Sequence, residues 1–204
     1  MRTLDIGWCY TETELEIGCY EPEPVYDVYK NINSAFKVCP AIKKYLENFY
    51  LIRSPIQLEF FIKKDKNDFF ISYPGKKEEE DGKKYIAFDE RKREWHPDHA
   101  DDLSKNLKFK ESNFPLISFS FHYLFISDIP NVYIEELPPF LHFYKSSFYN
   151  NLRFIPGSFD IGRWFRAIDI ACEYVGEYDR IVIKRGDPMC YVRFNTPNNK
   201  KIKL

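Results

Sequence analysis

Arginine and aromatic side chains occur together near the end of the chain, and this combination can bind anions and ring systems. Arg163, Trp164, Arg166 and Arg193 are the residues of interest. The planar guanidinium group matches phosphate and carboxylate groups, and an indole ring can stack on a ligand. We predict that these residues bind a small anionic ligand or a partner protein. The alternative is that the arginines pair with the equally abundant acids of this chain.

A second group of residues could bind a metal ion. His96 and Asp98 form an H-x-D pair, as in jelly-roll iron oxygenases, whose third ligand is a distant histidine. His142 is the candidate third ligand, and Arg153 could bind the carboxylate of 2-oxoglutarate. This hypothesis makes the protein a non-haem Fe(II)/2-oxoglutarate-type oxygenase with iron as its cofactor. The polar residues 90–94 before the pair favour a solvated loop instead, so the leading hypothesis has no metal and no cofactor.

Other catalytic motifs are missing from the sequence. It has no G-x-S-x-G elbow, no Walker loop and no dinucleotide-binding fingerprint. His122 lies in an apolar stretch and is interpreted as a structural histidine. The Arg185-Gly186-Asp187 tripeptide is followed by Pro188, which is typical of a turn. Whether the protein is an enzyme stays open at this point, with a non-catalytic role favoured.

Composition limits the class of protein. The chain has 204 residues, of which 18% are aromatic, and aromatic side chains favour strands. Its net charge of -1 argues against a general electrostatic grip on nucleic acid. Five cysteines without a C-x-x-C pair indicate buried, reduced thiols in an intracellular protein. We find no signal peptide and no apolar stretch long enough to span a membrane, so no membrane partner is expected.

The elements that would position these residues are mostly strands. Residues 116–126 give the clearest case, because apolar and polar side chains alternate there with period two. Further strands are predicted at 131–137, 152–156, 164–171, 181–184 and 189–194. Residues 169–175 could instead be helical, since Ile168, Cys172 and Val175 would share one helix face. Pro40 begins a short predicted helix through Leu46.

Together these features predict a mainly β fold in a single domain, 1–204. The expected architecture is an antiparallel sandwich or a jelly-roll-like barrel with one or two short helices. A polar excursion is expected at about 74–113 and a flexible tail at 197–204.

Four segments together resemble an uncharacterised family of tailed-phage proteins of about this length, notably from marine bacteria. They are the segments 38–41 (VCPA), 51–55 (LIRSP), 160–166 (DIGRWFR) and 183–189 (IKRGDPM), and the resemblance covers residues 38–195. It implies a viral origin, but it brings no known activity and no functional residues.

The leading hypothesis is therefore a non-catalytic phage or phage-like protein that binds a partner protein or a small anionic ligand. Such a protein would be a virion component or would act in the host cytoplasm. Besides the oxygenase, a self-assembling structural protein is the third alternative, with a homo-oligomer as its product. Nucleic acid is not an expected partner.

Overall fold

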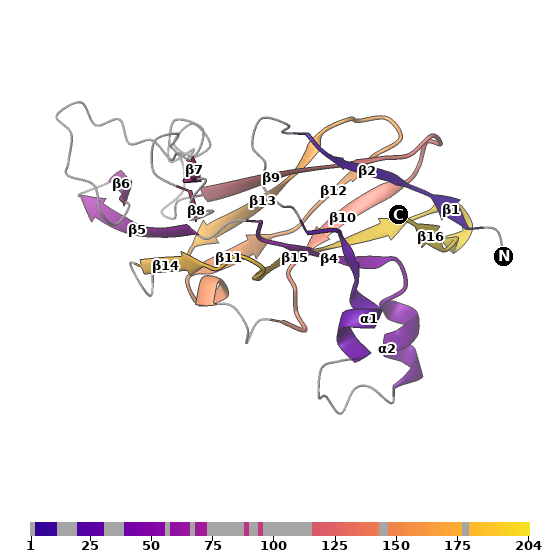
Figure 1. The fold of residues 1–204 in the computed structure, drawn as a ribbon, viewed down its shortest axis with the longest axis horizontal. Coiled ribbons are helices and arrows are strands. Elements are labelled where there is room, and N and C mark those ends of the chain that lie inside the picture. Colours follow the sequence, from indigo (N-terminus) through magenta and orange to yellow (C-terminus); the bar gives the residue numbers. More distant parts are fainter. Residues whose placement is uncertain are drawn as a thin grey trace.

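Two antiparallel sheets face each other and enclose the main hydrophobic core (Figure 1). The computed structural model describes residues 3–11, 20–30, 39–55, 58–65, 68–72, 88–89, 94–95, 116–142, 147–176 and 180–204. Within these ranges no sheet closes into a barrel. The predicted mainly β, antiparallel fold is confirmed, and the two sheets form a sandwich.

The five-stranded sheet has the strand order β12-β10-β15-β4-β3. Its strands are β12 (Gly157–Asp160), β10 (Tyr133–Leu137), β15 (Pro188–Asn195), β4 (Phe49–Arg53) and β3 (Glu23–Pro24). All of its neighbouring strands are antiparallel. Strand β12 lies at one edge of this sheet, which matters for the site described below.

The four-stranded sheet has the order β11-β13-β9-β2. Its strands are β11 (Leu152–Ile155), β13 (Ala167–Tyr174), β9 (Leu116–Ile126) and β2 (Gly7–Tyr10). The chain changes sheets at Pro156, between β11 and β12, and returns from β12 to β13 through residues 161–166. The turn at 161–166 therefore connects an edge of one sheet to the interior of the other.

Smaller elements complete the described structure. They are the three-stranded sheet β14 (Arg180–Ile183), β5 (Leu58–Asp65) and β6 (Asp68–Ser72), and the pairs β1 (Leu4–Asp5) with β16 (Ile202–Lys203) and β7 (Phe88–Asp89) with β8 (Glu94–Trp95). The helices are α1 (Val25–Lys30), α2 (Pro40–Tyr45) and the 3₁₀ segments η4 (Ser147–Asn150) and η5 (Pro197–Asn199).

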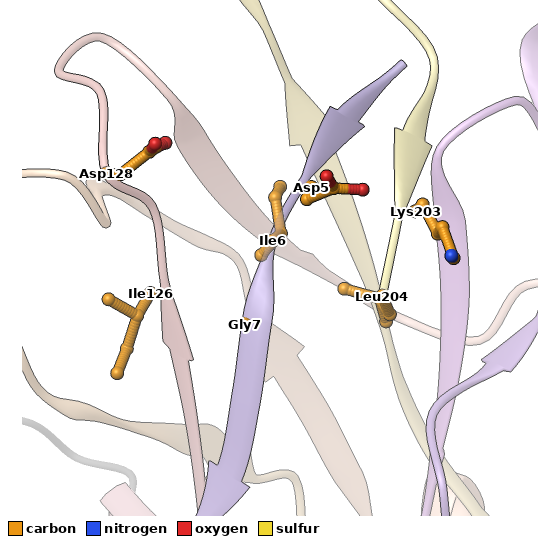
Figure 2. Close-up of a pocket in the computed structure, with 7 residues that line it drawn as sticks. All are labelled: Asp5, Ile6, Gly7, Ile126, Asp128, Lys203 and Leu204. Carbon is orange, nitrogen blue, oxygen red and sulfur yellow. The ribbon is translucent and has the colours of Figure 1, made fainter.

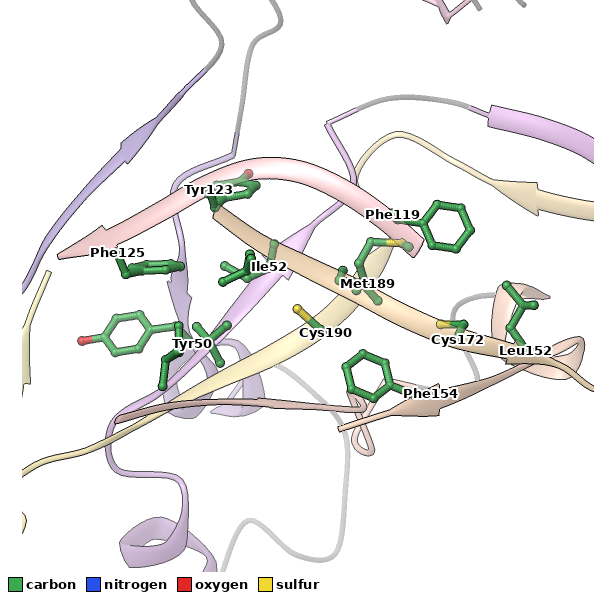
Figure 3. Close-up of a cluster of buried hydrophobic side chains, with 14 of the residues drawn as sticks. Tyr50, Ile52, Phe119, Tyr123, Phe125, Leu152, Phe154, Cys172, Met189 and Cys190 are labelled. Atoms are coloured by element: carbon green, nitrogen blue, oxygen red, sulfur yellow. The ribbon is translucent and has the colours of Figure 1, made fainter. Parts of the chain in front are cut away.

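Aromatic and aliphatic side chains from both sheets meet in the main core (Figure 3). Phe125 of β9 contacts Phe194 of β15 edge to face, with ring centroids 5.3 Å apart, and Tyr50 of β4 lies 5.8 Å from the same phenylalanine. Along β13 buried and half-buried residues alternate, as expected for a strand with one face on the core. Burial of these rings is the main source of stability of the sandwich.

A second, smaller core lies on the opposite face of the five-stranded sheet, beneath α1 and α2. It contains Val25 and Leu46 together with Phe49, Leu51 and Tyr191 of the sheet. Strands β4 and β15 are therefore covered on both faces, which explains their nearly continuous apolar sequences. The predicted helix at Pro40 is confirmed as α2, with proline in its first turn.

Two sequence-based expectations about strands differ from the structure. The strand predicted at 164–171 begins only at Ala167, so Trp164 to Arg166 lie in a turn. The helical alternative for 169–175 is wrong, because this segment pairs with both β9 and β11. The turn predicted at Arg185 to Pro188 is confirmed, and Gly186 has a φ of 84° there.

The structure also bears on the expectations for the C-terminal tail, the cysteines and the segment 74–113. The tail at 197–204 differs from its predicted flexibility, because Ile202 is buried and its N–H donates to the Asn48 side chain. Cys172 and Cys190 are buried as expected, whereas Cys9 is exposed on the edge strand β2. Of the excursion predicted at 74–113, only β7 and β8 belong to the described residues.

Candidate functional site

The turn between β12 and β13 is held by hydrogen bonds to one residue, Asp160. Its carbonyl oxygen accepts the N–H groups of Arg163 at 3.2 Å and Trp164 at 2.9 Å. Its carboxylate accepts the N–H of Gly162 at 3.0 Å and the N–H of Asn131, just before β10, at 2.9 Å. An aspartate that bonds backbone N–H groups in this way fixes the conformation of a turn.

Close contact with a neighbouring loop fixes the turn further. A Cβ atom on Gly162 would lie 2.1 Å from the carbonyl oxygen of Ile129, so only glycine fits this position. The preceding residue, Ile161, is fully buried and its N–H donates to the Val132 carbonyl at 2.9 Å. The turn is therefore held by the buried Ile161 side chain and by the close approach of Gly162 to the loop at Ile129.

Two large aromatic side chains project from this fixed turn. Trp164 is 54% exposed and Phe165 is 64% exposed. The guanidinium carbon of Arg166 lies 5.0 Å from the Trp164 ring centroid and 5.5 Å from that of Phe159, so it stacks near both rings. We call residues Arg163–Arg166 the aromatic turn. Tryptophan and arginine side chains of this kind are enriched among the residues that contribute most to binding energy at protein interfaces.

The four residues predicted to bind ligand do not all come together. Arg163, Trp164 and Arg166 share the aromatic turn, but Arg193 lies on the helix-covered face of the five-stranded sheet, 5.7 Å from the Tyr45 ring centroid. Each arginine of this set has an acidic partner in the structure. The pairs are Arg163–Asp160 at 3.5 Å, Arg166–Asp169 at 2.7 Å and Arg193–Glu135 at 3.6 Å. This arrangement favours a contact surface over an anion pocket.

A buried carboxyl group lies beside the aromatic turn, and the sequence analysis did not identify it. Glu136 of β10 is only 5% exposed, and within the described part of the chain its carboxyl makes no hydrogen bond. Burial raises the pKa of this carboxyl from 4.5 to about 7, while Arg166 lowers the pKa and Asp169 raises it. Its period-two relation to the apolar Ile134 on the same strand could have revealed that it faces inward.

Open space lies next to Glu136 at the sheet edge. Glu136 is paired directly with Gly157 of β12, so a side chain at position 157 would lie on the same face of the sheet. Nothing lies within 4 Å of the position that a Cβ on Gly157 would occupy. At this edge no side chain of β12 therefore covers the Glu136 carboxyl.

The histidines of the iron hypothesis cannot be assembled from the described residues. His96, His99 and Asp98 lie outside them. His142 is buried, and its Nδ1 atom is hydrogen-bonded to the Tyr191 hydroxyl, in the core beneath the helices rather than between the two sheets. No group of three or more metal-binding side chains occurs in the described ranges. The triad stays a prediction.

His122 lies in β9 at a φ of 58°, where the pairing of β9 with β13 changes register. Its carbonyl accepts the N–H of Thr11 at 2.9 Å, and its ring contacts Tyr10 edge to face. These contacts fit the structural role expected for this histidine, at an irregularity that bends the strand.

A surface hollow of about 450 Å³ lies at the far end of the sandwich, beside β1 and β16 (Figure 2). It is lined by Asp5, Ile6, Gly7, Ile126, Asp128, Lys203 and Leu204. Figure 2 shows Asp128 set apart from Asp5 and Lys203, so the charged groups do not converge on one point. This arrangement offers no defined polar site for a ligand.

Comparisons with models of protein families, with curated proteins and with solved structures found no match. Among the described residues, no helix is both long and apolar enough to cross a membrane. The site must therefore be interpreted from its own geometry.

The buried Glu136 predicts a specific pH dependence of stability. Its folded-state pKa of about 7 exceeds 4.5, so the folded protein holds this proton more tightly than the unfolded chain. The contribution of Glu136 to stability should be complete below pH 4.5 and be lost as the pH rises through 7, by about 3 kcal/mol at most. Glu136→Gln should remove this loss, as measured by urea unfolding at pH 5 and pH 8. Equal pH dependence in wild type and variant would contradict the assignment, with Glu135→Gln as the matched control.

Gly157, the first residue of β12, and Gly162, just after the strand, should respond differently to alanine. Gly162→Ala should destabilise the protein by about 1–3 kcal/mol, because the new methyl group overlaps the Ile129 carbonyl. Gly157→Ala should change stability by less than about 1 kcal/mol, since its methyl group enters open space. Urea unfolding of both variants makes the comparison, and similar losses for the two would show that the turn is not held as described.

Proposed function

We propose that this protein is a non-catalytic binding protein that recognises a partner protein through the aromatic turn, Arg163–Arg166. The observation that carries the proposal is the exposure of Trp164 and Phe165 on a backbone already fixed by Asp160 and Gly162. A surface fixed before binding loses little conformational entropy when the partner arrives. Tryptophan and arginine are also enriched among residues that dominate binding energy.

The ion pairs favour a protein partner over a small anion. An anionic ligand would have to compete with Asp160 for Arg163 and with Asp169 for Arg166. A protein partner can instead bury the two rings and leave both ion pairs at the rim of the contact. Combined with the resemblance to a tailed-phage family, this supports a role as a virion component or as a factor acting in the infected cell.

Photo-crosslinking from the aromatic turn tests the proposal. A photoreactive phenylalanine analogue at position 165 should capture one dominant protein in the native host, because Phe165 is more than half exposed. The same analogue at Tyr45, a 49% exposed residue on α2, is the matched control and should not capture that protein. The captured protein, once purified, should bind Trp164→Ala about 30-fold more weakly than wild type, a loss of about 2 kcal/mol.

Two outcomes would contradict the proposal. Identical crosslinked products from positions 45 and 165 would mean that the aromatic turn has no special role. A crosslink between two copies of this chain would favour the self-assembling structural protein instead.

A further inference from the structure

Strand β12 leaves part of its backbone without a partner. The N–H of Ile161 donates to the carbonyl of Val132, and hydrogen-bonded pairs alternate along an antiparallel ladder. Gly157 and Phe159 therefore direct their N–H and C=O groups toward β10. Ser158, between them, directs both groups away from the sheet, and it is exposed. Within the described ranges no residue pairs with these two groups.

The edge is only partly protected against strand addition. Edge strands are commonly blocked by proline, by lysine, by a bulge or by a covering element. Pro156 lies just before β12 and the charged Asp160 ends it, but the three residues between them, 157–159, are neither proline nor charged, and their pairing with β10 is regular. By contrast, β3 at the opposite edge is only two residues long, contains Pro24 and leads directly into α1. An extended chain could therefore extend the five-stranded sheet at β12.

Above pH 7 the inward face of this edge carries an uncompensated negative charge. The ionised Glu136 carboxyl, the Asp169 carboxylate and the Arg166 guanidinium sum to one negative charge, and Arg166 is already paired with Asp169. Because Gly157 has no side chain, a long side chain from an added strand could pass it and reach Glu136. A cation at that point would give the buried carboxyl the partner that it lacks.

We propose that β12 binds an extended segment of the partner as an added antiparallel strand, with a lysine or arginine opposite Gly157 that pairs with Glu136. This inference rests on the proposed function and names the chemistry of the partner segment. The residue opposite Ser158 forms two backbone hydrogen bonds with it. The residue opposite Phe159 is apolar and lies against the aromatic turn, where Trp164 contacts Phe159 with ring centroids 5.7 Å apart.

A second copy of this chain, paired at the same edge, would not supply a cation for Glu136. Two β12 strands paired antiparallel about Ser158 would set Phe159 of one copy opposite Gly157 of the other. Glu136 would then face a phenyl ring instead of a cation. The charge at the edge thus favours a basic segment over self-pairing.

Synthetic peptides test the inference without knowledge of the natural partner. The probe is a short threonine-rich peptide with leucine and, two residues later, lysine. Its controls carry norleucine in place of lysine, or an N-methyl group on the threonine between leucine and lysine. At pH 8, where Glu136 is ionised, the lysine peptide should bind about tenfold more tightly than the norleucine peptide. Bound peptide should slow hydrogen exchange of the Ser158 amide.

Matched variants connect the effect to the proposed contacts. Glu136→Gln should abolish the preference for lysine, and Gly157→Leu should abolish binding by filling the space before Glu136. Glu135→Gln should retain the preference, because Glu135 faces the helix side of the sheet and pairs with Arg193.

Equal binding of the two peptides, a preference that survives Glu136→Gln, or unchanged exchange at Ser158 would overturn the inference. If crosslinking from position 165 succeeds while the peptides fail, the partner binds the aromatic turn without adding a strand. If the peptides behave as expected while crosslinking fails, strand addition at β12 stands and the aromatic turn is not the main contact.

Discussion

The hydrogen bonds to Asp160 determine how the chain passes from one sheet to the other. Two backbone N–H groups donate to its carbonyl and two more to its carboxylate, so β12, the start of β10 and the turn share one anchor. The glycine at 162 allows the closest approach at this point. Because the backbone is fixed by these bonds, Trp164 and Phe165 are exposed without being loosely held, which suits a surface that binds a partner.

The arrangement of the two sheets explains why the groups that could bind a partner lie at one edge of the five-stranded sheet. Strands β4 and β15 are covered by the second sheet on one face and by helices on the other, so their side chains mainly serve the cores. Among the described strands, β12 pairs with β10 only. Glu136, one strand inward from that edge, is enclosed enough for its carboxyl pKa to rise, yet no side chain of β12 covers it at that edge.

Local patterns predicted the elements better than they predicted the site. Period-two alternation identified β9, and Pro40 identified the start of α2. The aromatic residues at 164 and 165 favoured a strand by propensity, whereas contacts distant in sequence, from Asn131 and Ile129, hold them in a turn. Arg193 was grouped with Arg163 because both are arginines near aromatic residues. Which face of the sheet each occupies depends on strand pairing, which the sequence does not reveal.

Recognition through the aromatic turn requires that its backbone be fixed before any partner binds. Backbone ¹⁵N relaxation of the free protein measures this directly, through the order parameters of Arg163, Trp164, Phe165 and Arg166. The structure predicts values near 0.85, equal to those of β10 and β13, because hydrogen bonds to Asp160 hold the start of the turn and Ala167, which follows it, pairs with Leu124 of β9. Values below about 0.6 would contradict the account, since the turn would then be mobile and would have to be ordered on binding.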